Sequence, residues 1–305
     1  MKIAVTGATG FIGKYLVETL INEGVSILVL GRCIDKLNNV FDDTIEKIET
    51  DYSYQQLCSQ LNGVDIVVHL ASRLMQRDTD SLILNPFIQT NIINTENLYQ
   101  AALKVGVRQV IHTSSISVYS FQNDLPFKED QIARPANIYG VSKLFAEQNG
   151  DYLSSKSTLN VVNLRLARLF GVGERDSVVF TKYINLAKQG KTLEVWGEGK
   201  TRIDFIYIKD VIAALMSVIY REESISGTFN IGSGHAYTIT KIAETINLAF
   251  NNKNNISFNK AKQEVDFIIE MDISKAKKTL SWEPEWSLTK AVNDIKTILI
   301  KENEK

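Results

Sequence analysis

The chain has 305 residues, a formal net charge of −1, 44% hydrophobic residues and 23% charged residues. This length suits one large or two smaller domains, and the near-neutral charge excludes the basic surface typical of nucleic-acid binding. No apolar run approaches the roughly 18 residues of a membrane helix. Neither the cysteines, Cys33 and Cys58, nor the histidines, His69, His112 and His235, have metal-binding spacing. We therefore expect a cytoplasmic protein without a metal, in which His69 and His112, on apolar runs, are packing residues.

A strand, a glycine-rich turn and a helix are predicted at the start of the chain. Residues 3–5 are an apolar run typical of a buried strand, and helical periodicity follows from residue 15. Gly7 allows a tight turn, Gly10 lets a pyrophosphate approach the backbone, and Gly13 lets the helix pack against the strand. This order predicts a dinucleotide site at the helix N-terminus, with an ordinary glycine turn as the alternative. The candidate ligands here are Gly7, Thr9, Gly10, Phe11, Ile12 and Gly13.

Strands and helices alternate through the first half of the chain. Further strands are predicted at 26–30, 44–49, 65–70, 109–113 and 160–166. Long helical stretches are predicted at about 85–105 and 137–154. This alternation predicts an α/β fold, a Rossmann-type doubly wound parallel sheet that binds ligands beyond the carboxyl ends of its strands.

The alternation loosens after about residue 170. Helices are predicted at 177–190, 209–221, 238–250, 273–279 and 287–301, with a short strand at 192–196. We interpret residues 1–170 as the dinucleotide-binding domain and residues 171–305 mainly as a smaller α/β substrate-binding lobe. A strand and helix at 204–221 are expected to return to the first domain.

Tyr139 and Lys143 are four residues apart on a predicted helix, so their side chains share a face. A free tyrosine has a pKa of about 10, and a nearby ammonium lowers it by favouring the phenolate. Tyr139 is then suited to move a proton at a substrate oxygen. Ser114 and Ser115 follow the 109–113 strand, where a hydroxyl can hydrogen-bond that oxygen. The alternatives are a surface tyrosine–lysine pair and a turn-forming serine pair.

Together these motifs resemble the extended short-chain dehydrogenases/reductases, the NAD-dependent epimerase/dehydratase family of nucleotide-sugar enzymes. The resemblance implies that Ser115 is the catalytic serine, that Tyr139 is the acid/base, and that Lys143 also holds the nicotinamide ribose. It implies a homodimer that packs the 85–105 and Tyr139 helices into a four-helix bundle. Further matching segments are His69-Leu70-Ala71, which adds Leu70 and Ala71 as cofactor contacts, Asn91, Arg165–Gly171, Gly197–Gly199, Asp204–Tyr207, Asp210, Asn230–Gly234, Asp272–Ala276 and Leu280–Pro284.

The end of the 26–30 strand indicates which dinucleotide is bound. NAD-binding members usually place an aspartate there for the adenosine ribose, whereas this chain has Gly31 followed by Arg32. An arginine suits a 2′-phosphate, Lys36 can assist it, and Asp51 is a candidate contact for the adenine. We therefore expect NADP(H) in preference to NAD(H). The alternatives are a solvated loop arginine and an ordinary loop carboxylate.

These features predict NADPH-dependent reduction of a 4-keto nucleotide sugar, specifically a nucleoside-diphosphate 4-keto-6-deoxyhexose. Thr113 is followed by two serines, not by the acidic pair of the family's 4,6-dehydratases. One alternative is an NAD-dependent nucleotide-sugar 4-epimerase. Another is a non-catalytic dinucleotide-binding sensor, although such proteins typically lose the tyrosine or the lysine.

Two arginines are candidate contacts for the substrate diphosphate. Arg168 stands where sugar epimerases often have an asparagine, and Arg202 lies one position before the usual arginine site, which is Ile203 here. Residues 261–266 lack the arginine that the family often has. A non-nucleotide substrate, such as a plant-type carbonyl compound or a sterol, therefore stays open as an alternative.

Overall fold

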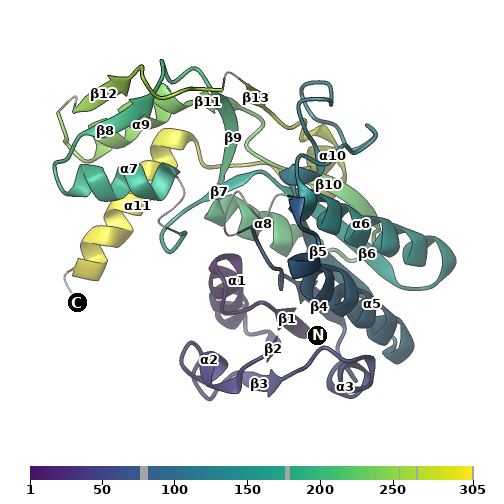
Figure 1. Ribbon diagram of the computed structural model, residues 1–305. Helices are drawn as coiled ribbons and strands as arrows, with labels where there is room; N and C mark the ends of the chain where they lie inside the picture. Colours follow the sequence, from purple (N-terminus) through teal and green to yellow (C-terminus); the bar gives the residue numbers. More distant parts are fainter. Residues whose placement is uncertain (76–81, 176–178, 254, 266, 304–305) are drawn as a thin grey trace. The chain divides into compact units, whose positions relative to one another are not determined.

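The computed structural model describes residues 1–75, 82–175, 179–253, 255–265 and 267–303 (Figure 1). Residues 177 and 178 of one predicted helix, and Asp266, lie outside these ranges. The chain forms two compact units. Unit 1 comprises Met1–Asn123, Glu129–Leu166 and Ile212–Asn230, and unit 2 comprises Asp124–Lys128, Ala167–Val211 and Ile231–Lys305.

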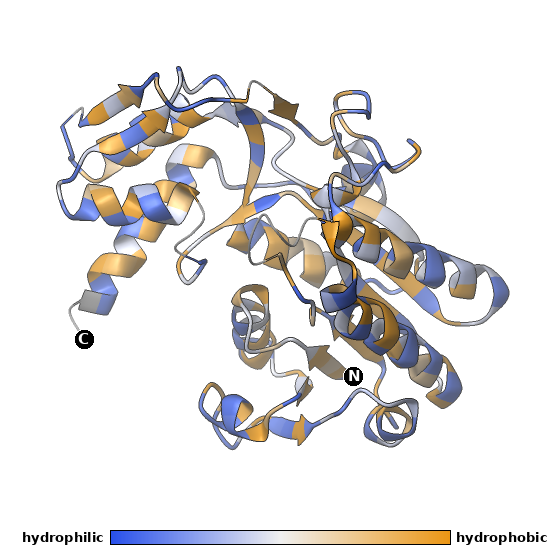
Figure 2. Ribbon diagram, in the orientation of Figure 1, coloured by the Kyte–Doolittle hydropathy of each residue, from blue (hydrophilic) through white to orange (hydrophobic). Residues whose placement is uncertain are grey.

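Unit 1 is built around a seven-stranded sheet with the strand order β10-β6-β5-β4-β1-β2-β3. Neighbouring strands from β6 to β3 run parallel. Strands buried on both faces need continuous apolar runs, and Figure 2 colours each residue by its hydropathy. β4 is buried at every position. The predicted Rossmann-type parallel sheet is confirmed. The strands are β1 Lys2–Thr6, β2 Ser26–Gly31, β3 Glu46–Glu49, β4 Ile66–His69, β5 Gln109–Ser115, β6 Asn160–Leu166 and β10 Gly227–Ile231.

The helices of unit 1 pack on this sheet through apolar faces. A core cluster joins Ala4, Val67 and Val110 of the sheet to residues of α3, α5 and α6. The alternate residues of each strand face the opposite side, as the two-residue period requires. The helical elements are α1 Phe11–Asn22, α2 Ile34–Asn38, α3 Tyr54–Gln60, α4 Asn85–Phe87, η2 Ile88–Ile93, α5 Asn94–Val105, η3 Ile116–Val118 and α6 Ile138–Lys156.

The predicted range 85–105 is helical throughout, but it is not α-helical along its whole length. It is divided into α4, a π-helical segment η2 and α5. Asn91, inside η2, is buried, and its amide group bonds both the N–H and the carbonyl of Arg73 at 2.7 and 3.0 Å. A wider helical turn that places a polar side chain against another backbone is a frequent feature of functional sites.

Unit 2 contains a four-stranded sheet, in which β9 pairs with β7, β11 and β13, and a parallel pair of β8 and β12. Its core includes Phe170 and Phe180, whose rings stack with centroids 4.0 Å apart. The elements are β7 Arg168–Phe170, α7 Val179–Lys188, β8 Leu193–Trp196, β9 Arg202–Tyr207, β11 Ala236–Thr238, α9 Ile239–Ala249, β12 Ile256–Asn259, β13 Ile268–Ile269, α10 Ser274–Leu280 and α11 Leu288–Asn303; α8, Ile208–Ile219, begins in unit 2 and ends in unit 1.

The return of the chain to the first unit differs from our expectation for residues 204–221. Residues 204–207 belong to β9 and therefore to the sheet of unit 2. The strand that joins the seven-stranded sheet is β10, twenty residues further along. Of the predicted returning segment, only the part of α8 from Ile212 onward lies in unit 1. Among the described helices, none combines the length and apolar character needed to span a bilayer.

Candidate active site

The glycine turn between β1 and α1 leaves no room for a side chain at Gly7 or Gly13. Gly7 has a φ of +69°, and a Cβ added there would lie 2.6 Å from the amide nitrogen of Ala71. A Cβ on Gly13 would lie 2.5 Å from the carbonyl oxygens of Gly7 and Ala8. The turn is closed by the Gly10 N–H, which donates to the Gly7 carbonyl at 2.9 Å. The result is a backbone cradle at a helix N-terminus, which fits the pyrophosphate of a dinucleotide.

The segment after β4 lies beside this cradle. The N–H of Leu70 donates to the Thr6 carbonyl at 3.2 Å, and the N–H of Ala71 donates to Thr6 Oγ1 at 3.3 Å. Because β1 and β4 are parallel neighbours, both segments leave the sheet at the same edge. Thr9, Phe11 and Ile12, the other candidates in the turn, are half-buried.

The candidates for the adenosine end of the cofactor follow the next two strands. Arg32 follows β2 and Asp51 lies two residues beyond β3; these strands are parallel neighbours, so both residues lie near the same sheet edge. Arg32, Lys36 and Asp51 are all exposed. Asp51 Oδ1 accepts a hydrogen bond from the Ser53 N–H at 2.7 Å. One of the carboxylate's hydrogen-bond acceptor sites is therefore already occupied in the turn before α3.

The start of α6 is held against the turn that follows β5. The Ala136 N–H donates to the Ser117 carbonyl at 3.0 Å. A Cβ on Gly140 would overlap that carbonyl oxygen and lie 2.7 Å from its carbon, so only glycine permits this approach. This packing carries the residue next to Gly140, Tyr139, toward the segment of Ser115. The sequence signal for this approach is the glycine directly after the tyrosine.

Ser115 and Ser114 differ in environment. Ser115 is half-buried, and its Oγ accepts a hydrogen bond from the Ser117 N–H at 3.1 Å. An oxygen used in this way as an acceptor keeps its own O–H to donate. Ser114 is buried, and its Oγ contacts no hydrogen-bond partner among the described residues. These environments favour Ser115 as the serine that contacts a ligand.

Lys143 is only 3% exposed and lies one helical turn after Tyr139. Its Nζ is 3.2 Å from His112 Nε2. Burial lowers the pKa of Lys143 to about 7, and the negative charge of Glu147 partly opposes this shift. Glu147 in turn forms a buried ion pair with Arg165, with 2.7 Å between Nη2 and Oε2. The Lys143 ammonium therefore sits in a dry setting where its charge acts strongly on neighbouring groups.

The two predicted substrate arginines both lie in unit 2, but not on one face of its sheet. Arg168 on β7 is in register with Phe205 on β9, so these two side chains share a face. Arg202 is three residues before Phe205 on β9, and an odd separation places it on the other face. Its Nη2 lies 3.9 Å from Glu270 Oε2. The register of β7 and β9 therefore argues against a diphosphate site that both arginines share.

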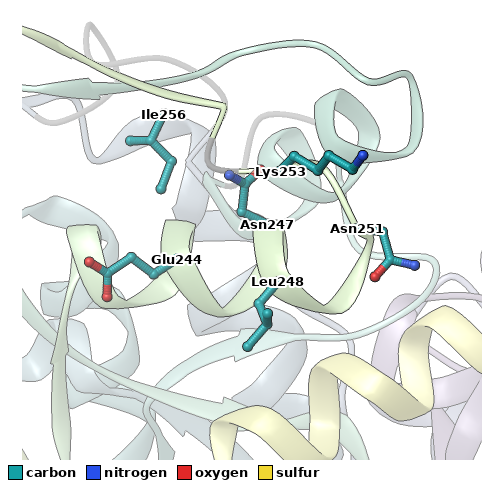
Figure 3. Close-up of a pocket in the computed structure, with 6 residues that line it drawn as sticks. All are labelled: Glu244, Asn247, Leu248, Asn251, Lys253 and Ile256. Atoms are coloured by element: carbon teal, nitrogen blue, oxygen red, sulfur yellow. The ribbon is translucent and has the colours of Figure 1, made fainter.

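A pocket in unit 2 was not expected from the sequence. It lies at the C-terminal end of α9 and in the turn before β12 (Figure 3). Among its described lining residues, Glu244 and Lys253 are the charged groups, and none is a serine, tyrosine or histidine. Elsewhere among the described residues, no group of three metal-ligating side chains is found. The pocket is lined by Glu244, Asn247, Leu248, Asn251, Lys253 and Ile256.

The fold and the glycine, serine, tyrosine and lysine positions define the class of short-chain dehydrogenases/reductases. A profile of the NAD dependent epimerase/dehydratase family matches residues 3–232. The chain therefore belongs to this family and is an enzyme, as the sequence predicted.

Solved structures and a curated relative agree with this assignment. UDP-N-acetylglucosamine 4-epimerase from Bacillus cereus is 35% identical, with a TM-score of 0.87 over 98% of this chain and 96% of that one. UDP-glucuronic acid 4-epimerase from the same species, in complex with UDP-glucuronic acid and NAD, is 26% identical, with a TM-score of 0.85 over 99% and 100%. The dTDP-4-dehydro-6-deoxyglucose reductase of Escherichia coli is 25% identical over 92% of each chain.

Proposed function

We propose that the protein is a nucleotide-sugar 4-epimerase that uses a nicotinamide dinucleotide held at the glycine turn. The observation that carries the proposal is the juxtaposition of Ser115, the Tyr139 helix and a buried Lys143 at the sheet edge of that turn, in a chain 35% identical to a 4-epimerase. This similarity favours epimerisation over the NADPH-dependent reduction that the sequence alone favoured.

The chain's residues divide the work as follows. Ser115 donates its free O–H to the sugar O4, since its oxygen already accepts from the Ser117 N–H. Tyr139 removes the proton from O4 and returns it, and the Lys143 ammonium stabilises the phenolate between these steps. The bound dinucleotide supplies reversible hydride transfer at C4. Because oxidation and reduction occur at one carbon, there is no net consumption of the cofactor.

A second candidate, NADPH-dependent reduction of a 4-keto sugar, rests on Arg32. Gly31 and Arg32 stand where an aspartate would accept hydrogen bonds from an unphosphorylated ribose, and Arg32 is exposed beyond β2. The relative that supports this second candidate is the dTDP-4-dehydro-6-deoxyglucose reductase, which is 25% identical. A preference for NADP(H) over NAD(H) goes with this candidate.

The test is to incubate the purified enzyme with UDP-N-acetylglucosamine, UDP-glucose or UDP-glucuronic acid and to follow the C4 epimers by chromatography. An epimerase gives an equilibrium mixture without net change in nicotinamide absorbance. A reductase instead needs a 4-keto-6-deoxy sugar nucleotide and oxidises one NADPH per product. If the enzyme turns over neither type of substrate, both candidate functions are wrong.

Tyr139→Phe provides the matching variant. Loss of a positioned acid/base lowers kcat by about 10²- to 10⁴-fold, while dinucleotide binding is retained. Tyr220→Phe is the control, because Tyr220 is 47% exposed and has no place in the proposed site. A Tyr139→Phe enzyme with unchanged kcat would contradict the mechanism.

The homodimer and the cytoplasmic location stay predictions. The α6 helix carries exposed apolar side chains at Val141, Phe145 and Tyr152, and these support a packed partner on that face.

A further inference from the structure

His112 lies on β5 and is only 1% exposed. From the sequence we interpreted it as a packing residue. Its ring does pack, with centroids 5.9 Å from His69 and 6.4 Å from Tyr99. Both of its nitrogens also have polar partners: Nε2 is 3.2 Å from Lys143 Nζ, and Nδ1 is 3.0 Å from Asn163 Oδ1.

The protonation pattern of this ring follows from its partners. Asn163 Nδ2 donates to Asp151 Oδ1 at 3.1 Å. A reversed amide would aim its oxygen at that carboxylate, so the oxygen of Asn163 faces His112. This oxygen can only accept, and therefore Nδ1 of His112 carries the proton. Nε2 then presents a lone pair to the Lys143 ammonium, which can only donate.

The surroundings keep this imidazole neutral. Burial, the positive charge of Lys143 and the proximity of His69 hold the pKa of His112 well below its usual value. The charged and titratable groups that face Lys143 are His112 from β5, His69 from β4, and Glu147 from its own helix. Of these, only His112 is hydrogen-bonded to Nζ among the described residues.

We propose that His112, fixed as its Nδ1–H tautomer by Asn163, is a positioning residue. Its Nε2 accepts a hydrogen bond from one of the three N–H groups of the Lys143 ammonium. The other two protons are thereby directed away from β5, toward the nicotinamide ribose and Tyr139. This inference rests on the proposed function for the roles of Lys143 and Tyr139, but the tautomer of His112 does not depend on any substrate.

The same contact raises the pKa of Lys143, so that its side chain stays charged to a higher pH. An acceptor for Nζ favours the ammonium and so works against burial, which alone favours the neutral amine. Removal of the acceptor should lower the pKa of Lys143. The Tyr139 phenolate then loses its stabilising charge, so the pH range of activity narrows from both sides.

The tautomer is tested on the whole protein labelled with ¹⁵N-histidine, which contains three histidines. The signals of His112 are those that disappear in His112→Phe. Near neutral pH they should show the Nδ1–H tautomer. An Nε2–H tautomer or an imidazolium in the unmodified protein would overturn the proposal, whether or not a substrate is known.

The kinetic test compares His112→Phe, which keeps a ring but has no acceptor, with His112→Gln, which restores an acceptor oxygen. In a plot of kcat against pH, the alkaline limb should move to lower pH by about one unit in His112→Phe, which corresponds to a tenfold lower proton affinity of Lys143. His112→Gln should recover most of this shift, and the exposed His235→Phe should show none. If the alkaline limb lies at the same pH in His112→Phe and in the unmodified enzyme, the positioning role of His112 is contradicted. If no substrate turns over, the pH dependence of dinucleotide affinity is compared in the same variants.

Discussion

Gly140→Ala should uncouple catalysis from cofactor binding. The added Cβ would overlap the carbonyl oxygen of Ser117 and lie 2.7 Å from its carbon and 3.2 Å from Pro135 Cβ. Non-bonded carbon–oxygen contacts begin near about 3.3 Å, so the start of α6 must move by about 1 Å or more. Both contacts at Ser117 are with backbone, which no change of rotamer can relieve.

The magnitude follows from this displacement. Overpacking of this kind costs about 1–3 kcal/mol of stability. A shift of about 1 Å between Tyr139 and the Ser115 segment can lower kcat by about 100-fold. The glycine turn lies at another part of the sheet edge, so only the contact of Lys143 with the dinucleotide is disturbed, and dinucleotide affinity should fall by no more than about tenfold, or roughly 1.4 kcal/mol.

Gly150→Ala is the matched control on the same helix. Its Cβ would lie 2.6 Å from Val161 Cγ1, a side-chain atom, far along α6 from Tyr139. It should lower stability without a comparable loss of kcat. The assays are urea unfolding, fluorescence titration with dinucleotide and turnover of a sugar nucleotide. A Gly140→Ala enzyme with unaltered kcat, or equal loss of kcat in Gly150→Ala, would refute the reasoning.

The remaining predictions concern stability. Glu147→Gln should lower the free energy of unfolding by about 3–5 kcal/mol in urea denaturation, because it leaves the buried Arg165 guanidinium without its charged partner; a loss below about 1 kcal/mol would contradict this. Stability should also fall by roughly 2 kcal/mol as pH drops from about 6.5 to about 5, because unfolded His69 and His112 gain protons there. In the folded protein, burial lowers the pKa of His69 to about 3 and that of His112 well below its usual value. Asp204, whose pKa burial raises to about 6, gains a proton more readily when folded and opposes this trend in part. A free energy of unfolding that stays constant or rises toward pH 5 would show that the histidines are not buried and neutral.

Most strands of the seven-stranded sheet could be predicted because they are continuous apolar runs, whereas β3 contains three charged residues and β10 has no counterpart among the predicted strands. The expected limits for β6 agree with the structure, those for β1 differ by one residue at each end, and those for β2 differ by one residue at the C-terminal end. The family could be recognised because its motifs are local, with fixed spacing between glycines and between Tyr139 and Lys143.

What could not be predicted depends on contacts between distant residues. β7, β11 and β13 have only two or three residues each, too few to show a period. The opposite faces of Arg168 and Arg202 follow from a strand register that the sequence does not show. His112 resembled a packing residue because its polar partners, Lys143 and Asn163, come from a later helix and strand.

The late position of β10 bears on how the protein is made. β6 ends at Leu166 and its neighbour β10 begins at Gly227, so 227 − 166 = 61 positions separate them. A ribosome adding roughly 5–20 residues per second needs about 3–12 s to cover this distance. Throughout this interval the nascent sheet ends at β6, whose outer N–H and C=O groups have no partner strand and can pair with another chain. Because this edge is open until β10 is made, products truncated before Gly227 should aggregate.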